Sequence, residues 1–138
     1  MRYLLDTNVV SELKRPSPDA RVRAWYAAAP AEGLHLSVVT FGEIRRGIER
    51  LRPRDRGRAD DLSAWLDGLI SAYGDRILPV DRAVADAWGV LTAIDDRSAV
   101  DAFLAATASV HALTLVTRNV RDFANWGVWL LNPFESPS

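Results

Sequence analysis

Short apolar runs and longer amphipathic stretches alternate along the chain. Apolar runs bounded by polar turns are typical of buried strands, and they occur at residues 3–5, 34–37, 77–80, 113–116 and 128–131. Between them, apolar side chains recur at helical spacing, as in residues 38–51, where Val38, Phe41, Ile44, Ile48 and Leu51 follow one another. Further helices are predicted at residues 9–14, 20–29, 60–73, 82–93 and 101–112.

Strands that alternate with helices predict a parallel sheet covered on both faces. Because the helical stretches outweigh the strands, the sheet should be small. We therefore predict an α/β fold, with a small parallel β-sheet flanked by helices on both faces, in a single domain of residues 1–138. The closing segment NPFESPS, residues 132–138, is expected to fray.

The composition is that of a folded, soluble chain, with 49% hydrophobic and 25% charged residues. No apolar run approaches the length that spans a membrane, and Asp6 interrupts the first run too early for a secretory signal. The absence of cysteine excludes disulfides, thiolate metal sites and cysteine catalysis. A cytoplasmic protein with no membrane contact is the simplest expectation.

Positive charge is concentrated in one stretch although the formal net charge is only −1. Lys14 is the only lysine, and arginines crowd residues 45–58, RRGIERLRPRDRGR. Arginine forks suit phosphate groups, and a local basic strip can bind a polyanion whatever the net charge. The strip is equally typical of a solvated helix face in an arginine-rich protein, so both interpretations stay open.

Acidic residues occur where predicted strands end or helices begin. Asp6 follows the first strand, Glu43 lies about one helical turn after the second, and Asp101 opens a helix. Thr117, Asn119 and Asp122 follow the strand at residues 113–116. The carboxyl ends of parallel strands meet at one edge of the sheet, where ligands bind. Carboxylates gathered there would repel one another, and such clusters suit Mg²⁺ or Mn²⁺.

Each acidic residue also has a structural interpretation. Asp6 or Asn8 could cap the helix that follows, and Asp101 could be a helix cap in the same way. Glu43 could be an exposed helix acid on the side of Arg46, and Asp122 could be a turn aspartate. One such interpretation is easily accepted for a single residue, whereas four of them together are improbable.

The order of motifs resembles a known family. LLDTNVVSEL, SVVTFGEIRRGI, DAFLAATA and LTLVTRNVRDF, followed by a strand that leads into NP, look like the PIN-domain ribonucleases. The pattern is closest to the VapC/FitB-type toxins of bacterial toxin–antitoxin pairs. The resemblance implies a PIN-like α/β/α sandwich that hydrolyses RNA phosphodiesters with Mg²⁺ or Mn²⁺. It also implies a cognate antitoxin that blocks the site, and a homodimer.

The family's acidic quartet maps onto Asp6, Glu43, Asp101 and Asp122. Many relatives place an aspartate where this chain has Asn119, so either Asp122 or Asn119 could complete the site. Around the quartet, polar residues are expected to brace the acids and arginines to hold flanking phosphates: Thr7, Asn8 and Thr117, and Arg45, Arg46 and Arg118.

Two rival functions remain at this point. A phosphatase of the haloacid-dehalogenase type also begins with a strand ending in aspartate, but it needs a second aspartate where this chain has Asn8, and a late lysine. The more serious rival is a catalytically silent PIN-like module that binds a partner protein. Loss of metal binding would favour that module.

Overall fold

A five-stranded parallel sheet runs through the middle of the molecule. The computed structural model describes residues 1–135. Its strands stand in the order β3-β2-β1-β4-β5, and every neighbouring pair is parallel. Their bounds are β1 Tyr3–Leu5, β2 Leu34–Ser37, β3 Ile77–Leu78, β4 Thr114–Val116 and β5 Leu130–Leu131.

Successive strand residues point to opposite faces of the sheet, and this alternation divides the core into two. Leu5 and Val116 belong to one buried cluster, whereas their neighbours Leu4 and Leu115 belong to the other. All four side chains are fully buried. The uninterrupted apolar runs of the central strands therefore reflect a sheet that is covered on both sides.

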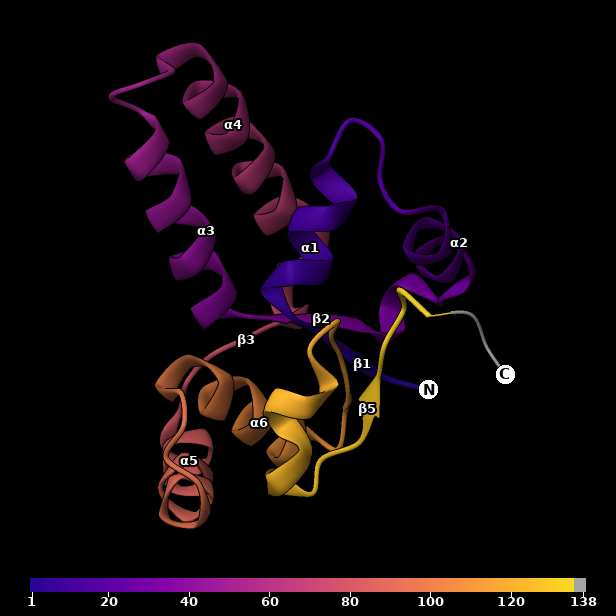
Figure 1. Cartoon of the computed structure of the whole chain (residues 1–138), viewed down its shortest axis with the longest axis vertical. Helices are drawn as coiled ribbons and strands as arrows, with labels where there is room; N and C mark the ends of the chain where they lie inside the picture. The colour runs from indigo at the N-terminus through magenta and orange to yellow at the C-terminus, as the bar shows by residue number, and fades with distance from the viewer. Residues whose placement is uncertain (136–138) are drawn as a thin grey trace.

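Helices cover both faces, as Figure 1 shows. The first cluster packs against α1, α2, α3 and α4, and the second against α5, α6 and the 3₁₀ helix η3. The bounds are α1 Thr7–Lys14, α2 Ala20–Ala28, α3 Val38–Leu51, α4 Arg56–Tyr73, α5 Arg82–Ile94 and α6 Ala99–His111, with η1 Ala31–Gly33, η2 Gly74–Arg76 and η3 Val120–Trp126. The predicted α/β/α sandwich is thus confirmed.

None of the helices in this described range combines the length and apolarity needed to traverse a lipid bilayer.

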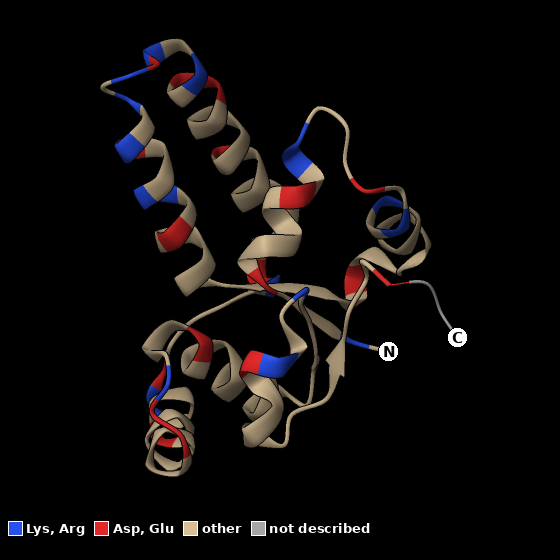
Figure 2. Cartoon of the chain, viewed as in Figure 1, with Lys and Arg blue, Asp and Glu red and all other residues tan. Residues whose placement is uncertain are grey.

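Helices α3 and α4 form a long hairpin that projects from the sheet, and its far end carries a concentration of basic residues (Figures 1 and 2). The sequence predicts α4 from residue 60, but the helix begins at Arg56. The Asp55 carboxylate explains the earlier start, because it accepts a hydrogen bond from the Arg58 backbone amide and caps the helix. Arg52 links the two helices through ion pairs with Glu49, at 3.0 Å, and Asp60, at 2.6 Å.

Other boundaries differ from the predicted ones for local reasons. Helix α1 begins at Thr7 rather than residue 9, because Asp6 is its N-cap. Helix α6 begins at Ala99 rather than Asp101, because Ser98 caps it. The outer strands β3 and β5 are each two residues long, shorter than the predicted runs, since an edge strand has a partner on one side only.

The closing segment is packed through Phe134, so the prediction of a frayed tail is wrong for residues 132–134. Phe134 is 7% exposed and belongs to the core cluster on the α1 side. Asn132 fixes the turn, since its side-chain oxygen accepts the Phe134 amide hydrogen at 2.9 Å and its side-chain nitrogen donates to the Arg118 carbonyl. The last three positions of the predicted tail, 136–138, lie outside the described residues.

Candidate active site

The strand order reverses direction beside β1, and the candidate site lies at that position. From β1, the chain proceeds to β2 on one side and later returns to β4 on the other. In open parallel sheets such a switch point leaves a crevice at the carboxyl ends of the strands. Asp6 follows β1 and Thr117 follows β4, and the two side chains meet there.

Asp6 has a buried carboxylate that accepts hydrogen bonds from three donors. Its Oδ1 accepts the Thr7 amide hydrogen at 2.6 Å, which makes Asp6 the cap of α1. Its Oδ2 accepts hydrogen bonds from the Thr117 hydroxyl at 2.8 Å and from the Asn8 side-chain nitrogen at 3.3 Å. The predicted cap and the predicted site residue are therefore the same residue, and Asn8 is not the cap.

The environment of Asp6 favours its protonated form. Burial raises the pKa of its carboxyl group from 3.8 to about 6, despite the hydrogen bonds from Thr117 and Thr7, which lower it. The charges of Asp101 and Glu43 raise this pKa further, so three acids from β1, α3 and α6 lie within electrostatic reach of one another.

Glu43 reaches the site from the second turn of α3. Its Oε1 accepts a hydrogen bond of 2.5 Å from the Thr7 hydroxyl, which is also hydrogen-bonded to the Thr40 hydroxyl at 3.2 Å. Glu43 is half-buried and makes no ion pair with Arg46 within residues 1–135. The interpretation of Glu43 as a surface helix acid paired with Arg46 is therefore wrong.

Asp101 lies in the first turn of α6, and its side chain is free of a capping role. The Ser98 hydroxyl caps the helix by accepting the Asp101 amide hydrogen at 3.3 Å, so the interpretation of Asp101 as the cap is wrong. Burial raises the pKa of the Asp101 carboxyl group, and the charges of Asp122 and Glu43 add to that shift. The charges of Asp122, from η3, and Glu43, from α3, therefore both act on Asp101.

Asp122 and Asn119 occupy different places in the segment after β4. Asp122 is exposed in the first turn of η3, and its charge acts on Asp101. The Asn119 backbone amide donates to the Thr117 hydroxyl at 3.0 Å, so this residue contacts the site through its backbone. The charge of Asp122 therefore associates it with Asp101.

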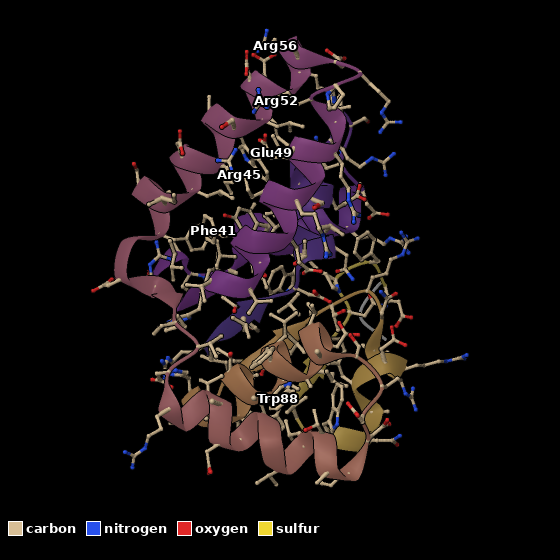
Figure 3. All side chains as sticks on the ribbon, turned by 90° about the vertical axis from the view of Figure 1, so that its left-hand side faces the viewer. Phe41, Arg45, Glu49, Arg52, Arg56 and Trp88 are labelled. Atoms are coloured by element: carbon tan, nitrogen blue, oxygen red, sulfur yellow. The ribbon has the colours of Figure 1, made fainter. Side chains whose placement is uncertain are left out.

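The three arginines predicted to hold phosphates lie in different environments. Arg45 faces α4, where it pairs with Glu49 at 3.5 Å and donates to the Ser63 hydroxyl, and Figure 3 shows it in the row with Glu49 and Arg52. Arg45 is therefore not brought to the acids. Arg46 is exposed. Arg118 adjoins the site, with its backbone amide donating to Asn8 and its guanidinium 4.6 Å from the centre of the Phe134 ring.

Two contributors were not identified from the sequence. Thr40 is fully buried on the same face of α3 as Ile44 and Ile48, and its hydroxyl supports the Thr7–Glu43 contact. A polar residue in an apolar stripe at helical spacing was the available signal. Phe134 supports Arg118 from a segment expected to fray, and no local pattern pointed to that contact.

The four acids carry negative charge that no cation balances. None of the ion pairs within residues 1–135 involves Asp6, Glu43, Asp101 or Asp122. A set of oxygen donors with unbalanced charge fits a hard divalent cation. The acids are not preassembled, however: no three acidic or histidine side chains of the described chain converge closely enough to form a ready coordination sphere.

The PIN domain family matches residues 3–127 of the chain. Over 138 residues the chain is 34% identical to the toxin FitB of Neisseria gonorrhoeae, covering 96% of this chain and 98% of FitB. It is 33% identical over 137 residues to the VapC ribonuclease Y4jK of Sinorhizobium fredii, covering 96% of this chain and 97% of that protein.

Solved structures share the fold. The crystal structure of FitAcB from Neisseria gonorrhoeae superposes with a TM-score of 0.90 at 34% identity, covering 97% of this chain and 99% of that one. A toxin–antitoxin complex from Klebsiella pneumoniae superposes with a TM-score of 0.67 at 25% identity, covering 97% of this chain and 99% of that one.

Proposed function

This chain belongs to the PIN-domain family, alongside the toxin FitB and the VapC ribonucleases, and on that premise we propose that it is a metal-dependent ribonuclease. Its role is that of the toxin in a toxin–antitoxin pair. It hydrolyses RNA phosphodiester bonds with Mg²⁺, or with Mn²⁺ in its place. The names of the relatives support the nuclease class and the toxin role, and the chemistry of the site supports the metal.

The observation that carries this proposal is the unbalanced group of acids beside β1. Burial and repulsion between the carboxylates raise the pKa of both Asp6 and Asp101, which means that their ionised forms are destabilised. Such a destabilised group of acids does not help the fold and is typical of a functional site. A bound divalent cation offsets this destabilisation, because it attracts the ionised form of each carboxylate. Asp6, Glu43, Asp101 and Asp122 are therefore the residues that would hold the metal.

The chain's own residues orient those acids. Thr117 and the Thr7 amide hold the two oxygens of Asp6, while the Thr7 hydroxyl holds Glu43. When bound, a divalent cation lowers the pKa of water and neutralises charge on the phosphate. In the hydrolysis, the water oxygen bonds to phosphorus, one P–O ester bond breaks, and the leaving oxygen takes up a proton. Arg118, whose backbone amide donates to Asn8 and whose guanidinium packs on Phe134, would contact a phosphate near the acids.

Cleavage of total cellular RNA by the purified protein tests the activity. We expect cutting with Mg²⁺ or Mn²⁺ and none with EDTA, and we expect Asp6→Asn and Asp101→Asn to abolish it. Asp67→Asn is the matched control, because Asp67 is exposed on α4 and has no ion pair within residues 1–135. Antitoxin carried through purification must be removed by refolding before the assay.

Metal binding distinguishes the ribonuclease from its rival, a catalytically silent PIN-like interaction module. A ligand at about 100 times its dissociation constant stabilises a folded protein by roughly 2.7 kcal/mol. We therefore expect Mg²⁺ to raise the melting temperature of the wild type and to have little effect on Asp101→Asn. No thermal shift and no cleavage together would favour the silent module.

We also propose two protein partners, a cognate antitoxin and a second copy of this chain. The Klebsiella pneumoniae neighbour is a toxin–antitoxin complex, which supports the first. Exposed apolar residues on α3 and α4, Val38 at 41% and Ile70 at 49%, offer surface for either partner. Light scattering of the isolated protein tests the homodimer, and a monomeric mass at micromolar concentration would contradict it.

A further inference from the structure

A groove leads away from the acids between α1 and the α3/α4 hairpin. It begins at Thr7 and Glu43, which belong to the candidate site, and continues past Lys14, Arg58 and Trp65. Its volume is about 270 Å³. A polymer whose scissile bond lies at the acids, and whose chain follows this groove, would contact these side chains.

The floor of the groove is apolar and has open space at Gly47. Ile44, Ile48 and Trp65 line it, and Gly47 lies among them on α3. A Cβ atom at Gly47 would meet nothing within 4 Å, so the missing side chain leaves open space. Apolar and aromatic surfaces of this kind accept the faces of nucleobases without selecting a sequence.

The rim of the groove is cationic. Glu43 is its only acid, whereas Lys14, Arg15 and Arg58 also line it. Arg15 pairs with Glu12 at 3.2 Å, but Lys14 and Arg58 make no ion pair within residues 1–135. The Lys14 ammonium lies 5.8 Å from the centre of the Trp65 ring, which holds it over the floor.

We propose that this groove binds the single-stranded RNA segment that flanks the cleaved bond, an inference that rests on the proposed ribonuclease function. Lys14 and Arg58 contact phosphates, and the bases lie on the floor around Gly47. The two unpaired cations favour a polyanion, and the apolar floor favours one that carries a flat aromatic face on every unit, as RNA does. The groove therefore determines how RNA leaves the acids, while the acids determine where it is cut.

Binding of a fluorescein-labelled, mixed-sequence RNA of about 20 nucleotides tests the rim. The measurement uses fluorescence anisotropy in EDTA, so that metal-dependent cleavage does not interfere. Each phosphate contact to a single strand contributes about 0.7 to the slope of log affinity against log salt. The double variant Lys14→Gln/Arg58→Gln should therefore show a slope shallower by about 1.4, with affinity lower by on the order of tenfold at low salt.

A matched control separates the groove from general charge. Arg50→Gln/Arg54→Gln removes the same charge from two exposed arginines of the hairpin that lie outside the groove and have no ion pair in the described chain. We expect that control to retain most of the wild-type slope. Equal losses in both double variants would overturn the proposal.

Filling the floor tests the groove without any change in charge. Gly47→Phe should weaken RNA binding about tenfold, because the ring occupies the space left by the glycine. Gly42→Phe is the control, since Gly42 is also exposed on α3 with nothing within 4 Å of its Cβ position, but lies outside the groove. Similar affinities for the two variants would contradict the proposal.

The results also distinguish this proposal from the ribonuclease itself. If the wild type cleaves RNA while the groove variants bind it normally, the groove assignment fails and the nuclease stands. If the groove variants lose binding but the wild type never cleaves, the nuclease fails and the groove remains an RNA site. Loss of binding only to a labelled polyglutamate peptide would assign the groove to an acidic protein and overturn the proposal.

Discussion

Thr117 donates its hydroxyl hydrogen to Oδ2 of Asp6 across 2.8 Å, although the two residues are 111 positions apart. The contact follows from the strand register, in which Leu5 pairs with Val116, so that the next residue of each strand emerges at the same edge. Together with the bond from the Asp6 amide to the Val116 carbonyl, this hydrogen bond joins the ends of β1 and β4 beside the acids. It also lowers the pKa of Asp6, against the effect of burial.

Removal of the Thr117 hydroxyl should therefore damage both stability and activity. Thr117→Val leaves Oδ2 of Asp6 with only the longer hydrogen bond from Asn8, and a lost hydrogen bond to a charged group costs about 1.5–3 kcal/mol of unfolding free energy. RNA cleavage should fall about tenfold or more, as for other residues that orient ligands. Urea denaturation and the cleavage assay measure the two effects. Thr117→Ser, which keeps the hydroxyl, should restore most of both.

The pH dependence of stability should report the burial of Asp6. Its folded-state pKa of about 6 lies above the ordinary 3.8, so between these values the folded chain binds a proton that the unfolded chain has lost. The metal-free protein should therefore lose stability as the pH rises from about 4 to about 6, and remain less stable above that range. A shift of this size corresponds to roughly 3 kcal/mol.

Asp6→Asn provides the comparison, because its side chain is neutral at every pH. In EDTA, its unfolding free energy should change less than that of the wild type between pH 4.5 and pH 8. Asp67→Asn should follow the wild-type curve, since Asp67 is an exposed residue of α4. A wild-type curve that rises with pH over this range would show that Asp6 is not the dominant titrating group.

Substitutions of Asp122 and Asn119 should have different effects, because only one of these residues is expected to complete the quartet. The charge of Asp122 acts on Asp101, whereas Asn119 contacts Thr117 through its backbone amide. We expect Asp122→Asn to lower cleavage by about tenfold or more, and Asn119→Ala to retain most of it. The midpoint of activity in a Mg²⁺ titration should move only in Asp122→Asn. The reverse ranking would assign the fourth position to Asn119.

Phe134 should contribute to stability although it lies near the end of the chain. Its ring is 7% exposed and packs into the core cluster beneath Arg118, so Phe134→Ala should cost roughly 3 kcal/mol. Trp129→Ala is the control, because that side chain is 65% exposed and its removal should change stability by about 0.5 kcal/mol or less. Urea denaturation compares the two. Equal, small effects would mean that the closing segment is dispensable.

Local patterns in the sequence were enough to predict most of the elements and to mark the acids as candidates. The helical spacing of α3 and the apolar run of β1 are properties of neighbouring residues, and burial of their apolar faces determines their conformation. Caps such as Ser98 were harder to choose, because Asp101 is an equally good cap by type. The folded structure decides between them, because the Ser98 hydroxyl is the group that accepts the Asp101 amide hydrogen.

Tertiary structure alone decided which residues meet. The position of Arg45 away from the acids depends on α4, which provides Ser63 on the facing helix. The contacts of Thr117 with Asp6 and of Arg118 with Phe134 depend on strand order and on the path of the closing segment. The sequence by itself determined which side chains could do chemistry, since residue type and local pattern are encoded in short stretches. Long-range packing determined their distances, burial and charge environment, because these properties belong to pairs of residues that only the folded sheet brings together.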